Sequence, residues 1–250
     1  MTSHLHDLAA PFRHEGSRDD VVVLLHGWTG SPAHLRLLGA ALTDDGYGVV
    51  APLLAGHGTR TEHMLTTTWR DWLRSAAEAA QGVLDDGRRL HVAGLSMGGI
   101  IGLLLAVTFD VSSLVTINAP QRVHSRLAWA APLLRGSGVV TKGRSMPPPA
   151  GDGAGYYHQY NESPVGTLAD LMDLAAAARR VLPRVTCPAL VMQSRTDETV
   201  KPISGELIYR ELGSARKRLV WLQHSRHVAT IDHEHRLIEE EVLRHLADAT

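Results

Sequence analysis

The sequence is poor in cysteine and carries no excess of charge of either sign. Cys187 is the single cysteine among 250 residues, which excludes an internal disulfide framework and a cysteine-rich zinc or iron–sulfur site. Lysine and arginine total 25 against 26 for aspartate and glutamate, so the formal net charge is -1. Because nucleic acids and anionic lipids are bound through basic surfaces, we expect no nucleic-acid partner and no polybasic membrane anchor.

The sequence also lacks a hydrophobic run long enough to cross a bilayer. The longest run, Gly98 to Phe109, has about 12 residues, whereas a membrane span needs roughly 20. Met1 to Phe12 contains no uninterrupted apolar stretch of the kind found in secretory signals. These absences predict a cytoplasmic protein. Hydrophobic residues still make up 44% of the chain, which is enough for one sizeable core.

Histidine, in contrast, is abundant. The chain has 15 histidines, and a free imidazole titrates at about pH 6.5. If these side chains are exposed, the protein becomes clearly cationic near pH 6.

Apolar, β-branched runs alternate with helical segments along most of the chain. This alternation predicts an α/β fold with a mostly parallel sheet and helices on both faces. The predicted strands are residues 21–25, 47–54, 90–95, 114–118, 189–193 and 219–222. The predicted helices are residues 32–45, 68–86, 98–109, 203–212 and 233–246.

The alternation breaks between residues 121 and 184. Helical pieces are predicted at 126–134 and 167–181, and between them Gly or Pro occupies 9 of the 20 positions from Gly136 to Gly155. A loop of this length inside a compact domain is usually a functional lid or a disordered segment. We therefore expect residues 1–120 and 185–250 to form the core and residues 121–184 to form an inserted cap.

The motif that carries chemistry is Gly94-Leu95-Ser96-Met97-Gly98, a G-x-S-x-G string. It lies between a predicted strand and a predicted helix, which is the context that makes the motif specific. The flanking glycines permit a tight, strained turn that would expose the Ser96 hydroxyl at the carboxyl edge of the sheet. The sequence thus predicts Ser96 as a nucleophile.

A serine hydroxyl needs a base, and in this architecture an acid and a histidine follow the serine in that order. After the strand 189–193 we predict Asp197 as the acid, with Glu198 as the fallback. Between the last strand and the last helix lie His224 and His227, and we assign His227 because a loop residue is free to reach Ser96. We expect His233 and His235 to be solvated surface residues. A metal site at this group of histidines is disfavoured, because few carboxylates lie at a spacing suitable for metal ligands. No cofactor is predicted.

Attack by an activated serine on a carbonyl also needs hydrogen-bond donors for a developing oxyanion. The backbone N–H of Met97, directly after the predicted nucleophile, is one candidate. The second is the backbone N–H of Trp28, in the loop after the first long strand, where Gly27 and Gly30 keep the main chain accessible. His57, between two glycines, is expected to order its loop rather than to catalyse.

Taken together, these segments resemble the α/β-hydrolase superfamily and, within it, the bacterial carboxylesterase and monoacylglycerol lipase group. The resemblance implies that Ser96, His227 and Asp197 are nucleophile, base and orienting acid, that Trp28 and Met97 form the oxyanion hole, and that residues 121–184 cap the site. The matching motifs, in the order of that family, are residues 26–32, 56–58, 71–72, 94–99, 187–190, 193–197 and 227–230.

The expected activity is cleavage of carboxylic esters through an acyl-enzyme on Ser96, with the acyl chain of a small ester against an apolar cap wall that includes Trp129. Monoacylglycerol lipase is the alternative within the same chemistry. The serine disfavours a dehalogenase, whereas thioester, amide, peroxide and C–C cleavage stay open. The alternative of another class is a non-hydrolytic ligand receptor on this fold, which an intact triad disfavours.

Overall fold

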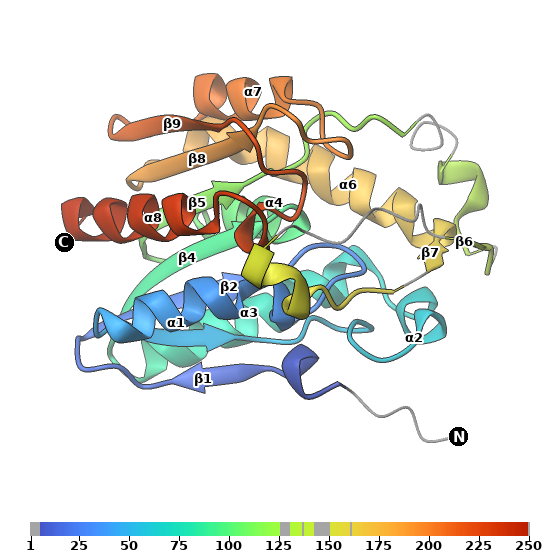
Figure 1. The fold of residues 1–250 in the computed structure, drawn as a ribbon. Helices are drawn as coiled ribbons and strands as arrows, with labels where there is room; N and C mark the ends of the chain where they lie inside the picture. Colours follow the sequence, from blue (N-terminus) through green and yellow to red (C-terminus); the bar gives the residue numbers. More distant parts are fainter. Residues whose placement is uncertain (1–5, 126–130, 137, 143–150, 161, 250) are drawn as a thin grey trace.

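The computed structural model describes residues 6–125, 131–136, 138–142, 151–160 and 162–249. A seven-stranded sheet with the order β1-β3-β2-β4-β5-β8-β9 forms its centre (Figure 1). All pairs are parallel except β1 with β3. The predicted α/β fold with a mostly parallel sheet is therefore confirmed. The strands are β1 (Phe12–His14), β2 (Asp20–Leu25), β3 (Gly48–Ala51), β4 (Arg89–Leu95), β5 (Val111–Ile117), β8 (Ala189–Ser194) and β9 (Lys217–Leu222).

Helices cover both faces of this sheet, with α1 and α8 on one side and the others on the opposite side (Figure 1). Helix α3 begins after Thr68, whose backbone N–H donates to the Asp71 carboxylate at 2.9 Å in a capping box that has Asp in place of the usual Glu. Within the described residues, no helix is both long and apolar enough to cross a membrane. The helices are α1 (Arg36–Asp44), α2 (Thr61–Leu65), α3 (Trp69–Asp85), α4 (Met97–Leu105), α6 (Val165–Val181), α7 (Ile203–Glu211) and α8 (His235–Ala249).

The side-chain alternation of β2 shows why the sheet needs two layers of helices. Val21, Val23 and Leu25 pack with α3 and α4, whereas Val22 and Leu24 pack against the α1 and α8 side. Every residue of β2 is buried, which is typical of a central parallel strand. The uninterrupted apolar run is thus the consequence of burial on both faces.

The sequence reading missed the edge strand β1, which pairs antiparallel with β3 from Phe12 opposite Ala51 to His14 opposite Val49. β1 has only three residues and none is fully buried, so it has no hydrophobic period to detect. The short helix α2 was also missed, because its five residues make little more than one turn and include only two buried side chains, Thr61 and Met64. The strand predicted at 47–54 is shorter in the structure, where β3 ends at Ala51.

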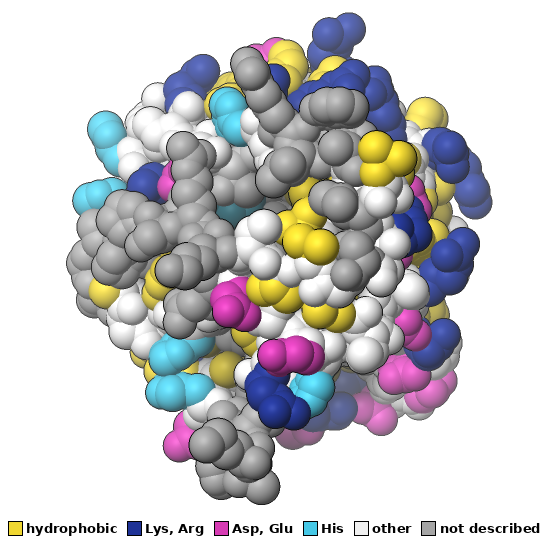
Figure 2. Space-filling model, turned by 90° about the vertical axis from the view of Figure 1, so that its right-hand side faces the viewer, with side chains coloured by type: hydrophobic (Ala, Val, Ile, Leu, Met, Phe, Trp, Pro, Cys, Tyr) yellow, Lys and Arg dark blue, Asp and Glu magenta, His cyan; other side chains and the backbone are white. Residues whose placement is uncertain are grey.

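Residues 121–184 contain a two-stranded antiparallel sheet of β6 (Val140–Lys142) and β7 (Glu162–Pro164), which is separate from the main sheet. Of the helix predicted at 126–134, residues 126–130 lie outside the described part, and Ala131–Leu134 is a 3-10 helix. Helix α6 follows β7, and its Leu174 and Ala178 are buried in the same cluster as α4. Figure 2 shows the face on the β6 and β7 side, where hydrophobic side chains gather between polar ones.

Several histidine side chains are buried in the fold rather than exposed to solvent. The prediction that His235 is a solvated surface residue was wrong: it is 8% exposed, and its Nδ1 lies 3.0 Å from Glu239 Oε1, one helical turn later. His233, two residues earlier, is exposed. Among the residues that the structure describes, the other buried histidines are His26, His34, His57, His91 and His245.

Candidate active site

The position of the site follows from the strand order. After β2 the chain forms β3, which lies beside β2 on one side, and then β4, which lies beside β2 on the other side. The direction in which successive strands are added to the sheet therefore reverses between β2 and β4. Ligands of open α/β sheets bind at such a reversal, beyond the carboxyl ends of the strands. Trp28 follows β2 at this point, and Ser96 follows β4.

Ser96 occupies the sharp turn between β4 and α4. Its φ is 55° and its ψ is -116°, a left-handed region that only a few non-glycine residues adopt. A Cβ at Gly94 would collide with the backbone of Gly98, and one at Gly98 would collide with the carbonyl of Leu25. The two glycines therefore allow the turn to fold tightly, and the Ser96 hydroxyl is held at the N-terminus of α4.

Three predicted residues from distant segments meet at this turn. The Nε2 atom of His227 lies 3.0 Å from Ser96 Oγ, and its Nδ1 lies 2.8 Å from Asp197 Oδ2. The Asp197 side chain is 0% exposed and that of His227 is 12% exposed. The alternatives do not take these positions, since His224 is exposed and the ring nitrogens of His227 are bonded to Ser96 and Asp197 rather than to Glu198.

Asp197 is held in place by the main chain. Its Oδ1 accepts hydrogen bonds from the backbone N–H groups of Thr199 and Val200, both at 2.8 Å. Its second oxygen is thereby directed to His227. Burial lowers the pKa of His227, but the Asp197 carboxylate and, less strongly, Glu198 outweigh burial, so the pKa lies above its ordinary value of 6.5.

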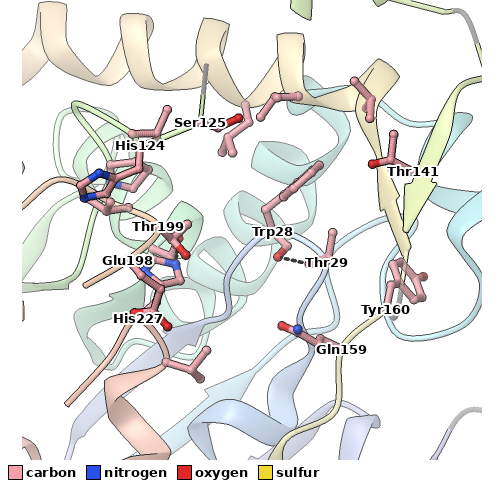
Figure 3. Close-up of a pocket in the computed structure, with 18 of the residues that line it drawn as sticks. Trp28, Thr29, His124, Ser125, Thr141, Gln159, Tyr160, Glu198, Thr199 and His227 are labelled. Carbon is pink, nitrogen blue, oxygen red and sulfur yellow. Dashed lines mark hydrogen bonds between the residues drawn. The ribbon is translucent and has the colours of Figure 1, made fainter. Parts of the chain in front are cut away.

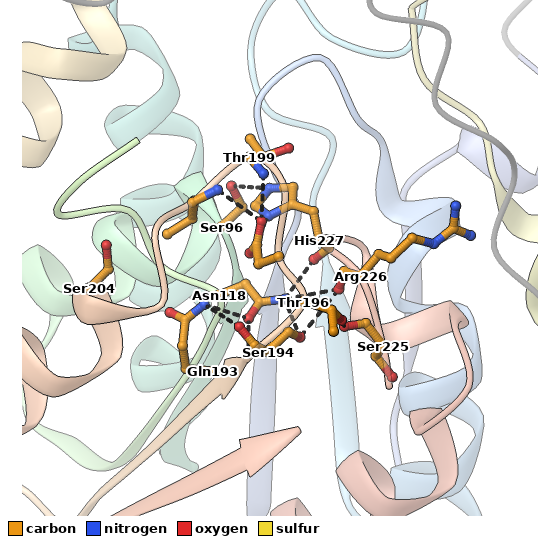
Figure 4. Close-up of polar contacts among 12 residues, drawn as sticks. Ser96, Asn118, Gln193, Ser194, Thr196, Thr199, Ser204, Ser225, Arg226 and His227 are labelled. Atoms are coloured by element: carbon orange, nitrogen blue, oxygen red, sulfur yellow. Dashed lines mark hydrogen bonds and ion pairs between the residues drawn. The ribbon is translucent and has the colours of Figure 1, made fainter. Parts of the chain in front are cut away.

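Asn118 is a functional neighbour that the sequence reading missed. It follows β5 with a φ of 49°, and it is completely buried. Its Nδ2 donates to the carbonyl oxygen of His227 at 2.8 Å, and its Oδ1 accepts from the backbone N–H of Ser194 at 2.7 Å (Figure 4). Asn118 thus connects the histidine loop to the strand before Asp197. The signal that could have identified it is a polar residue directly after a buried apolar strand.

The two predicted oxyanion donors lie beside the serine. A Cβ on Gly27 would be 3.3 Å from Ser96 Cβ, so the loop after β2 passes directly beside the nucleophile candidate. The backbone N–H groups of Trp28 and Met97 donate no hydrogen bond to any described residue. Two unused N–H groups at this place are available to an oxygen atom of a ligand.

Buried histidines shape the same loop. Nδ1 of His26 lies 2.9 Å from the carbonyl of Gly27, and its Nε2 accepts the backbone N–H of Leu54 at 3.1 Å. Burial lowers the pKa of His57 to about 4, so its ring is neutral at pH 7. His57 packs edge-on against His26 and Trp72. His57 therefore orders its own loop, the one after β3, as predicted for a histidine between two glycines.

A pocket of about 430 Å³ opens in front of Ser96 and His227. Ten of its 19 lining residues belong to residues 121–184. Leu168 and Leu171 of α6 contribute apolar side chains to its lining. Glu198 and His124 lie on the same side of the pocket as His227, away from Tyr160 (Figure 3). Trp129, predicted as part of the apolar wall, lies outside the described residues. Among the described side chains, no group of three or more His, Cys, Asp or Glu could hold a metal ion.

Comparison with known proteins places the chain among hydrolases. The model of the alpha/beta hydrolase family matches residues 22–240. The chain belongs to the alpha/beta hydrolase family. This confirms the family resemblance drawn from the motifs.

Relatives of this α/β hydrolase are similar over nearly their whole length. A carboxylesterase of Bacillus subtilis (strain 168) is 30% identical over 241 residues, which cover 94% of this chain and 95% of the relative. A thermostable monoacylglycerol lipase of Bacillus sp. (strain H-257) is 34% identical over 227 residues, 90% of each chain. A structure reported with the metagenome-derived lipolytic enzymes LipS and LipT superposes with a TM-score of 0.86 at 34% identity and covers 98% of this α/β hydrolase and 100% of that chain.

Proposed function

We propose that this α/β hydrolase cleaves carboxylic esters through an acyl-enzyme formed on Ser96. The observation that carries the proposal is the continuous hydrogen-bonded series from Ser96 Oγ through His227 to Asp197, at 3.0 Å and 2.8 Å. The protein is a carboxylic ester hydrolase, and the similarity over most of its length to a carboxylesterase and a monoacylglycerol lipase supports this conclusion.

In the first half of the reaction, Ser96 Oγ attacks the ester carbonyl carbon while His227 Nε2 takes the hydroxyl proton. The carbonyl oxygen becomes an oxyanion and accepts hydrogen bonds from the backbone N–H groups of Trp28 and Met97. His227 then gives its proton to the leaving alcohol. Water, activated by the same ring, releases the acid and restores Ser96.

Asp197 keeps the imidazole in the productive tautomer. With Nδ1–H bonded to the carboxylate, Nε2 is left as the proton acceptor that faces Ser96. The carboxylate also stabilises the imidazolium that forms during attack. Burial makes this interaction stronger than it would be in water.

We further propose that residues 121–184 act as the cap of this site and hold the acyl chain. Support comes from the share of the pocket wall that this segment contributes and from the apolar side chains of α6 that line it. A chain of methylene groups would gain binding free energy by leaving water there, at about 0.8 kcal/mol per buried CH₂.

The test is a panel of p-nitrophenyl esters from acetate to palmitate, run beside monoacylglycerols, with wild-type protein and Ser96→Ala. We expect turnover that Ser96→Ala abolishes, and labelling of Ser96 by a fluorophosphonate in stoichiometric amount. A preference for short acyl chains identifies a carboxylesterase, and a preference for glycerides identifies a monoacylglycerol lipase. Full activity in Ser96→Ala, or neither turnover nor labelling in the wild type, overturns the proposal and favours a ligand receptor.

A further inference from the structure

The side chain of Trp28 is tied to helix α6. Its indole Nε1–H donates a hydrogen bond to Thr167 Oγ1 at 3.0 Å, across 139 positions of the chain. Trp28 lies in the loop that follows β2, and Thr167 lies in the first turn of α6. The contact therefore joins the candidate oxyanion loop to the segment that lines the other side of the pocket.

Thr167 is well placed to hold the indole in one orientation. It is 3% exposed, and its hydroxyl donates to the carbonyl oxygen of Pro164 at 2.9 Å. Since the hydroxyl proton is used in that bond, its oxygen faces the indole only as an acceptor. Loss of this acceptor would leave the partly buried N–H of Trp28 without its partner, which costs free energy.

Two further hydrogen bonds join the same loop to residues 158–160. The backbone N–H of Tyr160 donates to the carbonyl of Thr29 at 3.0 Å, and Ser31 Oγ donates to the carbonyl of His158 at 2.9 Å. Thr29 has a φ of 62°, an unfavourable conformation for a β-branched residue. Such a conformation persists only where its surroundings hold it. The loop after β2 is thus held by hydrogen bonds of Trp28, Thr29 and Ser31 to residues 158–167.

We propose that Thr167 is a positioning residue for the Trp28 backbone N–H and so for stabilisation of the oxyanion. This inference rests on the proposed function. Thr167 does not line the described pocket, so it acts through Trp28 and not on the substrate. A hydrogen bond to an oxyanion weakens quickly with misalignment, whereas binding of the uncharged ester depends little on it. Loss of the Thr167 hydroxyl should therefore lower kcat and leave KM nearly unchanged.

The experiment compares Thr167→Val, which keeps the shape and removes the acceptor, with Thr167→Ser, which keeps the hydroxyl. We expect Thr167→Val to lower kcat for p-nitrophenyl butyrate about tenfold. This is less than the loss of about 10²–10³ in kcat that follows complete removal of one oxyanion donor. KM should stay within about twofold. Thr167→Ser should retain wild-type kcat. Thr43→Val, which also removes a helical threonine hydroxyl but lies on α1, is the matched control.

A second measurement separates positioning from a purely structural role. A trifluoromethyl ketone forms an oxyanion on Ser96, whereas the corresponding alcohol does not. Thr167→Val should weaken inhibition by the ketone as much as it lowers kcat and leave binding of the alcohol unchanged. Trp28→Phe removes the indole N–H and keeps an aromatic ring, so it should also weaken inhibition by the ketone more than binding of the alcohol. The double variant should be no worse than Trp28→Phe alone.

Unchanged kcat in folded Thr167→Val, or equal weakening of ketone and alcohol, overturns the inference. If Thr167→Val does not fold, Trp28→Phe decides the question by the same two measurements. Failure of the proposed function has a different signature, because wild-type protein would then show neither ester turnover nor labelling of Ser96.

Discussion

The side-chain amide of Asn118 donates a hydrogen bond to the carbonyl oxygen of His227 at 2.8 Å, across 109 positions of the chain. The same side chain accepts the backbone N–H of Ser194, three residues before Asp197. One buried side chain therefore holds the segments that carry His227 and Asp197 in a fixed relation.

Asn118→Ala should reduce both stability and activity. The change leaves the buried N–H of Ser194 and the carbonyl of His227 without a protein partner, at about 1–3 kcal/mol for each unpaired group. Urea unfolding should show this loss, and kcat should fall because His227 is no longer fixed. Gln81→Ala, an exposed amide on α3, should change neither quantity by comparison. Wild-type kcat in Asn118→Ala would contradict the assigned role.

Asp197→Asn should be far more damaging than Glu198→Gln. An amide at position 197 favours the wrong imidazole tautomer, and kcat should fall by about 10⁴-fold. Glu198 contacts neither ring nitrogen of His227, so Glu198→Gln should cost less than about tenfold. Steady-state kinetics of both variants on one p-nitrophenyl ester checks this. The reverse order of losses would assign the acid to Glu198.

The pH dependence of kcat/KM should report His227. Burial lowers its pKa, but Asp197 and then Glu198 raise it by more, so the net pKa is above 6.5. Because the base must be neutral, activity should be lost as pH falls through that raised value. Removal of one carboxylate in Glu198→Gln should move the midpoint to lower pH. A wild-type midpoint below about 6.5, or an upward shift in the variant, would contradict this electrostatic account.

Acid should destabilise the fold through its buried histidines. Burial lowers the pKa of His245, on α8 and far from the site, to about 4, whereas the unfolded chain titrates near 6.5. Between these values the unfolded state binds more protons, so stability is complete above about pH 6.5 and is lost as pH falls toward 4, by up to about 1.4 kcal/mol per pH unit. Urea unfolding of His245→Gln should show a weaker pH dependence than wild type. His233→Gln, at an exposed position, should show the same pH dependence as wild type. If the unfolding free energy changes with pH equally in all three proteins, buried His245 is not a source of the acid sensitivity.

Two glycine substitutions should act in opposite directions. A Cβ at Gly98 would collide with the carbonyl of Leu25 in β2, so Gly98→Ala should destabilise by about 3 kcal/mol or more. Gly82 lies inside α3, and a Cβ added there would meet no atom within 4 Å, so Gly82→Ala should stabilise by about 0.5–1 kcal/mol. Thermal unfolding measures both. A neutral Gly98→Ala would contradict the tight packing of the turn below Ser96.

Much of the fold could be predicted because strand and helix spacing is a local property. The run Val21 to Leu25 is apolar at every position because the strand is covered on both faces, and sequence periodicity records that burial directly. Ser96 could be placed for a similar reason, since the turn that holds it needs glycines at fixed positions. The edge strand β1 could not be predicted, because its three residues are at least partly exposed and show no alternation of apolar and polar side chains.

The order of the long strands and helices, the turn at Ser96, and the windows that hold an acid and a histidine could be derived from the amino-acid order alone. The folded arrangement was needed to show that His227 and Asp197, rather than His224 and Glu198, are joined by a hydrogen bond, that Asn118 joins their loops, and that His235 is buried. The reason is physical: spacing along a chain fixes which residues share a helix face or strand face, whereas contacts between loops depend on how several strand ends meet in space.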